Sequence, residues 1–168
     1  MGGHSPRFDD LVLSLAGSRV CFLPTASGDE SGQLVQLYER FGPRAEARHV
    51  SFHPWPRRDL RMCGWSAGML CWFEAGVTDS FGPELRDLRD GLAFLPGSAC
   101  QHYDSEEARR PVYRELVDRG FPPGYAADDG AALYFEGTAL DEVVAAVPGV
   151  RAYRIRPGSE EPLEARLP

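Results

Sequence analysis

The chain has 168 residues, which is enough for one domain with a hydrophobic core and short for two. Its 43% hydrophobic and 26% charged residues are typical of a globular protein, and its net charge of −7 without a basic patch argues against nucleic-acid binding. No basic-then-apolar leader opens the chain, and no apolar run approaches the ~18 residues of a membrane span. We therefore expect one soluble, cytoplasmic domain over residues 1–168, with no nucleic-acid or membrane partner.

The first part of the chain predicts alternating helices and strands. Apolar residues at helical spacing predict a helix over 8–15, and the run RVCFLP predicts a buried strand over 19–24. Ser31 can cap a second helix, which Gly42 and Pro43 close, and residues 45–52 indicate a second strand. A strand, a helix and a strand in this order are typical of the opening of a parallel α/β sheet.

The second part predicts shorter elements separated by turns. Residues 53–61 show no clear period, and an apolar helix-like run follows over 69–73. A longer helix is predicted to start at Ser105 and to end at Gly120. Short strands are expected at 92–95, 131–135, 142–147 and 151–155. The pattern predicts a three-layer α/β domain with a β-rich C-terminal edge.

Neither lysine nor paired cysteines are available for chemistry. All 18 basic residues are arginine, which excludes a Schiff-base lysine, a lysine general base and a phosphate-binding loop with its lysine. The four cysteines lie in or beside apolar stretches, and no two of them form a C-x-x-C pair: Cys21, Cys63, Cys71 and Cys100. We expect all four to be buried, reduced thiols.

The segment Gly64–Gly68 has the pattern G-x-S-x-G of a nucleophile elbow. In such an elbow, Ser66 would occupy a strained turn between a strand ending near Met62 and Cys63 and the helix that follows. Backbone N–H groups at the turn could then stabilise an oxyanion. The five residues are equally compatible with an ordinary strand–turn–helix corner.

A serine nucleophile needs a base, and the chain has four histidines. His4 lies in the N-terminal tail, while His49 and His53 have a spacing that a metal pair could use but no evident third ligand, so we expect no metal site. His102 follows a turn at the end of a predicted strand, where open α/β sheets place their sites. A surface histidine in a loop is the alternative for His102.

Several segments together resemble the peptidase E family of aspartyl dipeptidases. They cover well over half of the chain in the family's order. The matching segments are FLPTASGD (22–29), GWSAGMLCWFEAG (64–76), TDSFGPEL (78–85), DGLAFLPGS (90–98), HYDSEEARRPVYREL (102–116) and GYAADDGAAL (124–133). The resemblance implies a fold like that of class I glutamine amidotransferases, with a mostly parallel sheet.

The resemblance also implies a serine-type exopeptidase that cleaves short peptides after an N-terminal aspartate and needs no cofactor. Ser66 matches the family's nucleophile and His102 its catalytic histidine. Asp129 matches the acid that orients the histidine, while Asp79 matches a second aspartate implicated in catalysis. Either carboxylate could accept the Nδ1–H of His102, so both remain candidates.

The family's substrate arginine matches Arg109, with Arg110 as the neighbour that could replace it. A guanidinium can bind a substrate carboxylate through two parallel hydrogen bonds. A solvated arginine pair on a helix is the alternative for both residues. We expect a small peptide as the substrate and a monomer or a homodimer.

The chain also departs from the family. The strand, GGGN-type turn and helix that the family has between the second strand here and the elbow are missing, so the Ala67 N–H is the oxyanion donor that remains assured. Loss of one donor typically costs ~2.7–4 kcal/mol of transition-state stabilisation. A catalytically impaired descendant that binds a ligand or has no retained role is therefore the alternative function. A glutaminase is less favoured, because it would carry cysteine at the elbow.

Overall fold

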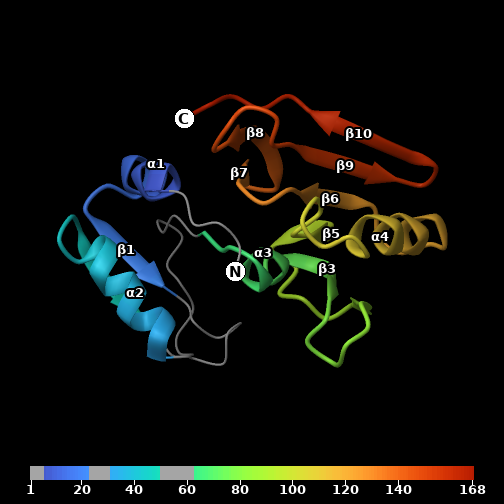
Figure 1. The fold of residues 1–168 in the computed structure, drawn as a ribbon, viewed down its shortest axis with the longest axis horizontal. Helices are drawn as coiled ribbons and strands as arrows, with labels where there is room; N and C mark the ends of the chain where they lie inside the picture. Colours follow the sequence, from blue (N-terminus) through green and yellow to red (C-terminus); the bar gives the residue numbers. More distant parts are fainter. Residues whose placement is uncertain (1–5, 23–30, 50–62) are drawn as a thin grey trace. The chain divides into compact units, whose positions relative to one another are not determined.

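The computed structural model describes residues 6–22, 31–49 and 63–168. The chain separates into two compact units, one formed within residues 5–63 and one by residues 64–168. Figure 1 shows the elements of both units along the chain. Each unit is described by itself, and the prediction of one domain over 1–168 stays a prediction.

The smaller unit confirms the predicted order of helix, strand, helix and strand. Its elements are α1 (Pro6–Ala16), β1 (Arg19–Phe22), α2 (Ser31–Phe41) and β2 (Glu46–His49). The two strands pair in parallel, with Arg19 opposite Glu46. Val20 of β1 packs with Leu37 and Phe41 of α2 in a small apolar core. Residues 23–24 and 50–52 of the two predicted strands lie outside the described residues.

The larger unit is built on a six-stranded sheet with the order β10-β9-β6-β5-β3-β4 (Figure 1). The strands of this sheet and the two helices of the unit are, in chain order, α3 (Ala67–Leu70), β3 (Phe73–Thr78), β4 (Arg86–Leu88), β5 (Leu95–Cys100), α4 (Arg109–Asp118), β6 (Gly124–Ala127), β9 (Ala152–Arg156) and β10 (Ser159–Leu163). The three central strands β3, β5 and β6 are parallel to one another, and both sides of the sheet continue in antiparallel strands. The sheet is therefore mixed, and the prediction of a mostly parallel sheet is wrong for the described residues. The connection between β9 and β10 is too short for the crossover that a parallel pair needs.

The sheet of the larger unit is covered on both faces. Successive residues of a strand point to opposite faces, and Cys100 packs in the apolar cluster that contains Tyr113 of α4. Its neighbour Ala99 packs in a different cluster, with Leu70 of α3. Phe135 belongs to a separate antiparallel hairpin, β7 (Ala131–Glu136) with β8 (Ala139–Ala145), and packs on the α3 side. The larger unit therefore has the expected three layers and a β-rich C-terminal region.

Some predicted elements are displaced in the structure. The apolar run at 69–73 is split, because the helix ends at Leu70 and Phe73 already opens β3. The strand expected at 92–95 is β5, and the helix expected from Ser105 begins at Arg109 after a series of turns. Strands β3, β4, β6 and β10 were not predicted. Short apolar runs do not distinguish a buried strand from a short helix, which explains the error at Phe73.

The prediction of four buried thiols is wrong for two of them. Cys100 is buried and Cys71 is half-buried, whereas Cys21 and Cys63 are exposed, and all four are free. On β1, Val20 faces the core, so alternation turns Cys21 outward. Burial raises the pKa of the Cys100 thiol to about 12, although the nearby Arg109 acts in the opposite direction. Within the described ranges, no helix has the length and apolar character needed to cross a membrane.

Candidate active site

Ser66 has a strained backbone that fits a nucleophile elbow. Its φ is 53° and its ψ is −127°, a conformation that is costly for a residue with a side chain, and α3 begins at the next residue. The turn is closed by a hydrogen bond from the N–H of Gly68 to the carbonyl of Trp65, at 2.9 Å. The expected preceding strand is not seen at Cys63, and Met62 lies outside the described residues.

Gly64 is required by the close approach of two backbone segments at this turn. A Cβ atom on Gly64 would lie 2.2 Å from the carbonyl oxygen of Gly68, well inside the closest contact that real side chains make. A Cβ atom on Gly68 would meet no atom within 4 Å. The two glycines of the motif therefore have different roles, and the first one allows the elbow to close.

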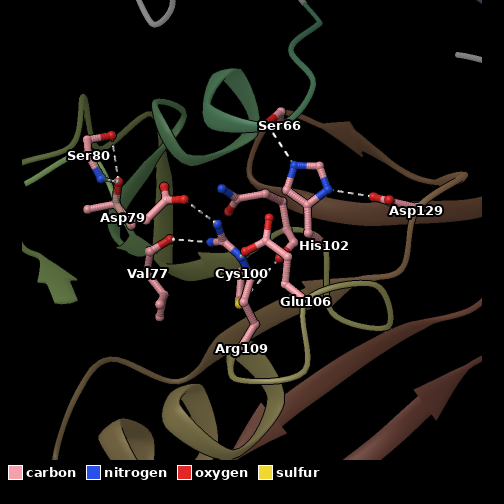
Figure 2. Close-up of polar contacts among 11 residues, drawn as sticks. Ser66, Val77, Asp79, Ser80, Cys100, His102, Glu106, Arg109 and Asp129 are labelled. Carbon is pink, nitrogen blue, oxygen red and sulfur yellow. Dashed lines mark hydrogen bonds and ion pairs between the residues drawn. The ribbon is translucent and has the colours of Figure 1, made fainter. Parts of the chain in front are cut away.

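Ser66, His102 and Asp129 form a continuous row of side chains, as Figure 2 shows. The Oγ atom of Ser66 lies 2.8 Å from Nε2 of His102, and Nδ1 of His102 lies 2.6 Å from Oδ1 of Asp129. A neutral imidazole with its proton on Nδ1 satisfies both contacts, because it donates to Asp129 and accepts from the serine hydroxyl. The arrangement matches a serine nucleophile with a general base and an orienting acid.

His102 and Asp129 both follow the carboxyl ends of neighbouring parallel strands. His102 follows β5 and Asp129 follows β6, so both lie at the edge where open α/β sheets place their sites. A hydrogen bond of 3.1 Å from the N–H of Tyr103 to the carbonyl of Ala127 ties the two loops together. His102 itself has a φ of 54°, so its backbone is also held in a left-handed conformation.

Asp129 is held by a backbone hydrogen bond and is partly shielded from water. Its N–H donates to Oδ1 of Asp104 at 2.8 Å, while the preceding residue Asp128 accepts the N–H of Arg151 at 3.0 Å. Burial raises the pKa of Asp128. The side chains of His102 and Asp129 are 16% and 28% exposed, which strengthens the ion pair that a protonated imidazole would form with the carboxylate.

The structure separates the two aspartates that the sequence left as alternatives. Asp129 lies against His102, whereas Asp79 follows β3 and its Oδ2 lies 3.5 Å from Nη2 of Arg109. Asp79 is therefore placed as an ion-pair partner rather than as the acid behind the imidazole (Figure 2).

Arg109 is buried, with an exposed fraction of 1%, and is not a solvated helix residue. Its Nε donates to Glu106 at 2.5 Å and its Nη1 donates to the carbonyl of Val77 at 3.1 Å (Figure 2). With Asp79 at the third nitrogen, the guanidinium is surrounded by acceptors from this chain. The pairing of Glu106 with Arg109 was not predicted from the sequence.

Arg110 lies in a different cluster. It makes a bidentate contact with Glu160 of β10, and its guanidinium lies over the rings of Tyr103 and Tyr153, 5.4 Å and 5.2 Å from their centroids. Glu160 also accepts the hydroxyl of Tyr103 at 2.8 Å. Partial burial acts to raise the pKa of Glu160, but the hydrogen bonds from Arg110 and Tyr103 outweigh it and the pKa is lowered. These contacts join the C-terminal hairpin to α4.

The backbone N–H of Ala67 lies directly after Ser66 in the chain. Ala67 is the first residue of α3, so its N–H is one of the helix-start donors that have no acceptor within the helix. Gln101 lies directly before His102, and its side chain is buried. The described residues include no cluster of three or more histidine, cysteine or acidic side chains that could hold a metal ion.

Comparison with known proteins points to one family. The model of peptidase family S51 matches residues 53–143, the range that contains all of the side chains described above from Ser66 to Asp129. The chain is also 37% identical to a protein of Bacillus subtilis (strain 168) called "Uncharacterized peptidase YgaJ", over 193 aligned residues that cover 89% of this chain and 83% of that relative. No solved structure gave a significant match. The alignment is longer than the chain, so the relative has residues for which this chain has no counterpart.

Proposed function

Because this chain belongs to peptidase family S51, we propose that it is a serine-type exopeptidase that hydrolyses short peptides with an N-terminal aspartate through an acyl-enzyme at Ser66. The observation that carries the proposal is the row formed by Ser66, His102 and Asp129, with contacts of 2.8 Å and 2.6 Å. Nucleophile, base and orienting acid are each within the distance that proton transfer requires.

In the acylation step, the Oγ of Ser66 attacks the carbonyl carbon of the scissile peptide bond. Its proton passes to Nε2 of His102, while the carbonyl π electrons move to the oxygen and form an oxyanion. Asp129 accepts the Nδ1–H and stabilises the imidazolium. When the tetrahedral intermediate collapses, the C–N bond breaks, and the leaving amine takes the proton from His102.

Water completes the cycle in the deacylation step. His102 removes a proton from a water molecule, which attacks the ester carbon of the acylated Ser66. The second tetrahedral intermediate releases the acid product, and the proton on His102 returns to the serine oxygen. Ser66 is exposed in the described structure, so a substrate can reach it.

The preference for an N-terminal aspartate is supported by the resemblance to aspartyl dipeptidases and by the place of Arg109. The contact between Arg109 and Asp79 is 3.5 Å long, and the Asp79 side chain is 57% exposed. A substrate carboxylate could take the place of Asp79 beside the guanidinium if Asp79 turned toward solvent. The substrate carboxylate would then replace that of Asp79 as the partner of Arg109, and the buried guanidinium would not be left unpaired.

The alternative is a descendant that no longer turns over substrate. The observation behind it is the length of the alignment, which shows that this chain is shorter than its relative within the matched region. Against it, Ser66 and His102 both retain costly positive φ values in a hydrogen-bonded arrangement. In a chain without selection for this geometry, substitutions that relieve the backbone strain at these two residues would be expected.

Hydrolysis of aspartyl p-nitroanilide by the purified protein tests the proposal. The release of p-nitroaniline by the wild type should exceed that by Ser66→Ala by at least about a thousandfold, because removal of a nucleophile leaves only residual catalysis. The rate of hydrolysis of alanyl p-nitroanilide, measured in parallel, gives the preference for aspartate. Equal rates for the wild type and Ser66→Ala would remove the peptidase mechanism.

A further inference from the structure

The side chain of Gln101 is a polar group that the proposed mechanism does not yet use. Gln101 has an exposed fraction of 6%, and its Oε1 atom is buried without a hydrogen-bond partner among the described residues. Most buried side-chain polar atoms in proteins are paired, because an unpaired one loses its hydration without compensation. The unpaired atom is an acceptor, so a donor role beside His102 would fall to the N–H groups of the same amide.

Strand alternation places Gln101 on the face of the sheet that carries α3. Ala99 of β5 packs on the side of the sheet that carries α3, and Cys100 packs on the side that carries α4. Continuing the alternation past the end of β5 returns Gln101 to the side of α3. Ser66 is the residue from which α3 starts, so the amide and the nucleophile belong to the same face of the sheet.

The oxyanion of the proposed reaction needs hydrogen-bond donors in addition to the N–H of Ala67. The two candidate arginines already have acceptors in this chain. Arg109 donates to Glu106 and to the carbonyl of Val77 and pairs with Asp79. Arg110 donates to Glu160. Glutamine and asparagine side chains are known to serve as oxyanion donors in enzymes. Gln101 is the amide side chain that the sequence places beside the catalytic histidine.

We propose that the side-chain amide of Gln101 donates the second hydrogen bond to the oxyanion, beside the backbone N–H of Ala67. The inference rests on the proposed serine peptidase function. When the carbonyl π electrons move to oxygen, an N–H of the Gln101 amide and the N–H of Ala67 both point at the negative charge. Gln101 transfers no proton, and the contact weakens again when the carbonyl re-forms and the leaving amine departs.

This role differs in its kinetics from simple substrate binding. A donor that is used mainly in the transition state changes kcat and leaves KM nearly constant, whereas a donor to the ground-state substrate changes KM. Gln101→Leu removes the donor and keeps a similar volume, and Gln101→Glu keeps the shape but replaces the donor by an acceptor. Gln36→Glu makes the same chemical change on the exposed surface of α2 and serves as the control.

The test measures kcat and KM for aspartyl p-nitroanilide, with the thermal midpoint of each variant. We expect both Gln101 variants to lose on the order of a hundred- to a thousandfold in kcat, with KM within about threefold of the wild type and the Gln36 control unchanged. If either folded variant keeps the wild-type kcat, or changes KM alone, the assignment of Gln101 is overturned while the peptidase function stands. If the wild type itself is no faster than Ser66→Ala, the peptidase function fails and the assignment falls with it.

Discussion

Nδ1 of His102 lies 2.6 Å from Oδ1 of Asp129, although the two residues are 27 positions apart in the sequence. The contact exists because β5 and β6 pair in parallel and end at the same edge of the sheet. It decides which aspartate can set the tautomer of the imidazole, since Asp79 lies against Arg109 instead. The orientation of the His102 ring is therefore a property of the sheet and not of one loop.

Replacement of Asp129 should abolish most activity without unfolding the protein. In Asp129→Asn, the amide can donate to Nδ1 and so stabilise the wrong tautomer, with the proton on Nε2. We expect kcat for aspartyl p-nitroanilide to fall by about a thousand- to ten-thousandfold. Asp141→Asn, at an exposed position of β8, is the matched control and should keep its activity. A kcat for Asp129→Asn near that of the control would show that Asp129 does not orient His102.

The strain at Ser66 predicts an unusual effect on stability. Glycine adopts a φ of 53° readily, so Ser66→Gly should relieve the strain, whereas Ser66→Ala should not. We expect Ser66→Gly to be about 1 kcal/mol more stable to urea than Ser66→Ala, with both inactive. Equal free energies of unfolding would indicate that the elbow is not strained in solution.

The two glycines of the elbow give a matched pair of substitutions. Gly64→Ala should destabilise the protein by about 1–3 kcal/mol and disturb the position of Ser66, because its Cβ would overlap the carbonyl of Gly68. Gly68→Ala meets open space and should be stable and active. Thermal midpoints and hydrolysis rates of both variants check the prediction, which is contradicted if the Gly68 variant is the more damaged of the two.

The buried position of Arg109 predicts a cost in stability for its removal. Arg109→Gln would leave the carbonyl of Val77 with a poorer partner and two carboxylates without their cation, so we expect a loss of about 3 kcal/mol in the free energy of unfolding. Arg89→Gln, at an exposed ion pair, should change stability by less than about 1 kcal/mol. Urea titrations compare the two variants, and similar losses would mean that Arg109 is not a buried anchor.

The lowered pKa of Glu160 predicts a dependence of stability on pH. Because the pKa is lower in the folded state, its contribution is complete above the unfolded value near 4.5 and is lost as the pH falls through the folded value. At pH 7, Glu160→Gln should be about 1–3 kcal/mol less stable than the wild type, and the difference should shrink toward pH 3. A difference that stays constant from pH 7 to pH 3 would show that the charge of Glu160 contributes nothing.

The sequence predicted the site better than the strands that hold it. The elbow motif, the position of His102 after a strand and the match to a family were enough to select Ser66 and His102, and they left Asp79 and Asp129 as alternative acids. The structure brings Ser66, His102 and Asp129 together. The choice between Asp79 and Asp129 depends on which loops meet at the sheet edge. That choice is a long-range property with no local signal in the sequence.

Other features of the structure could not be predicted from the sequence, for physical reasons. Strand β6 has the sequence GYAA, whose small residues give no apolar period, and its Gly124 is needed because a Cβ would lie 1.9 Å from the carbonyl of Ser98. The burial of Arg109 could not be foreseen, since its acceptors come from the end of β3 and from the turns before α4, which are far apart in the sequence. The unpaired Oε1 atom of Gln101 is visible only once its surroundings are packed.

Covalent labelling of Ser66 tests the central claim most directly. The wild type, Ser66→Ala and His102→Ala are incubated with a fluorophosphonate, and the modified residue is identified by peptide mass spectrometry. The account predicts that the wild type is labelled at Ser66, that Ser66→Ala is not labelled, and that His102→Ala reacts at least about a hundredfold more slowly, because its serine has no base. Labelling of Ser66 at the same rate with and without His102, or no labelling of the folded wild type, would contradict it.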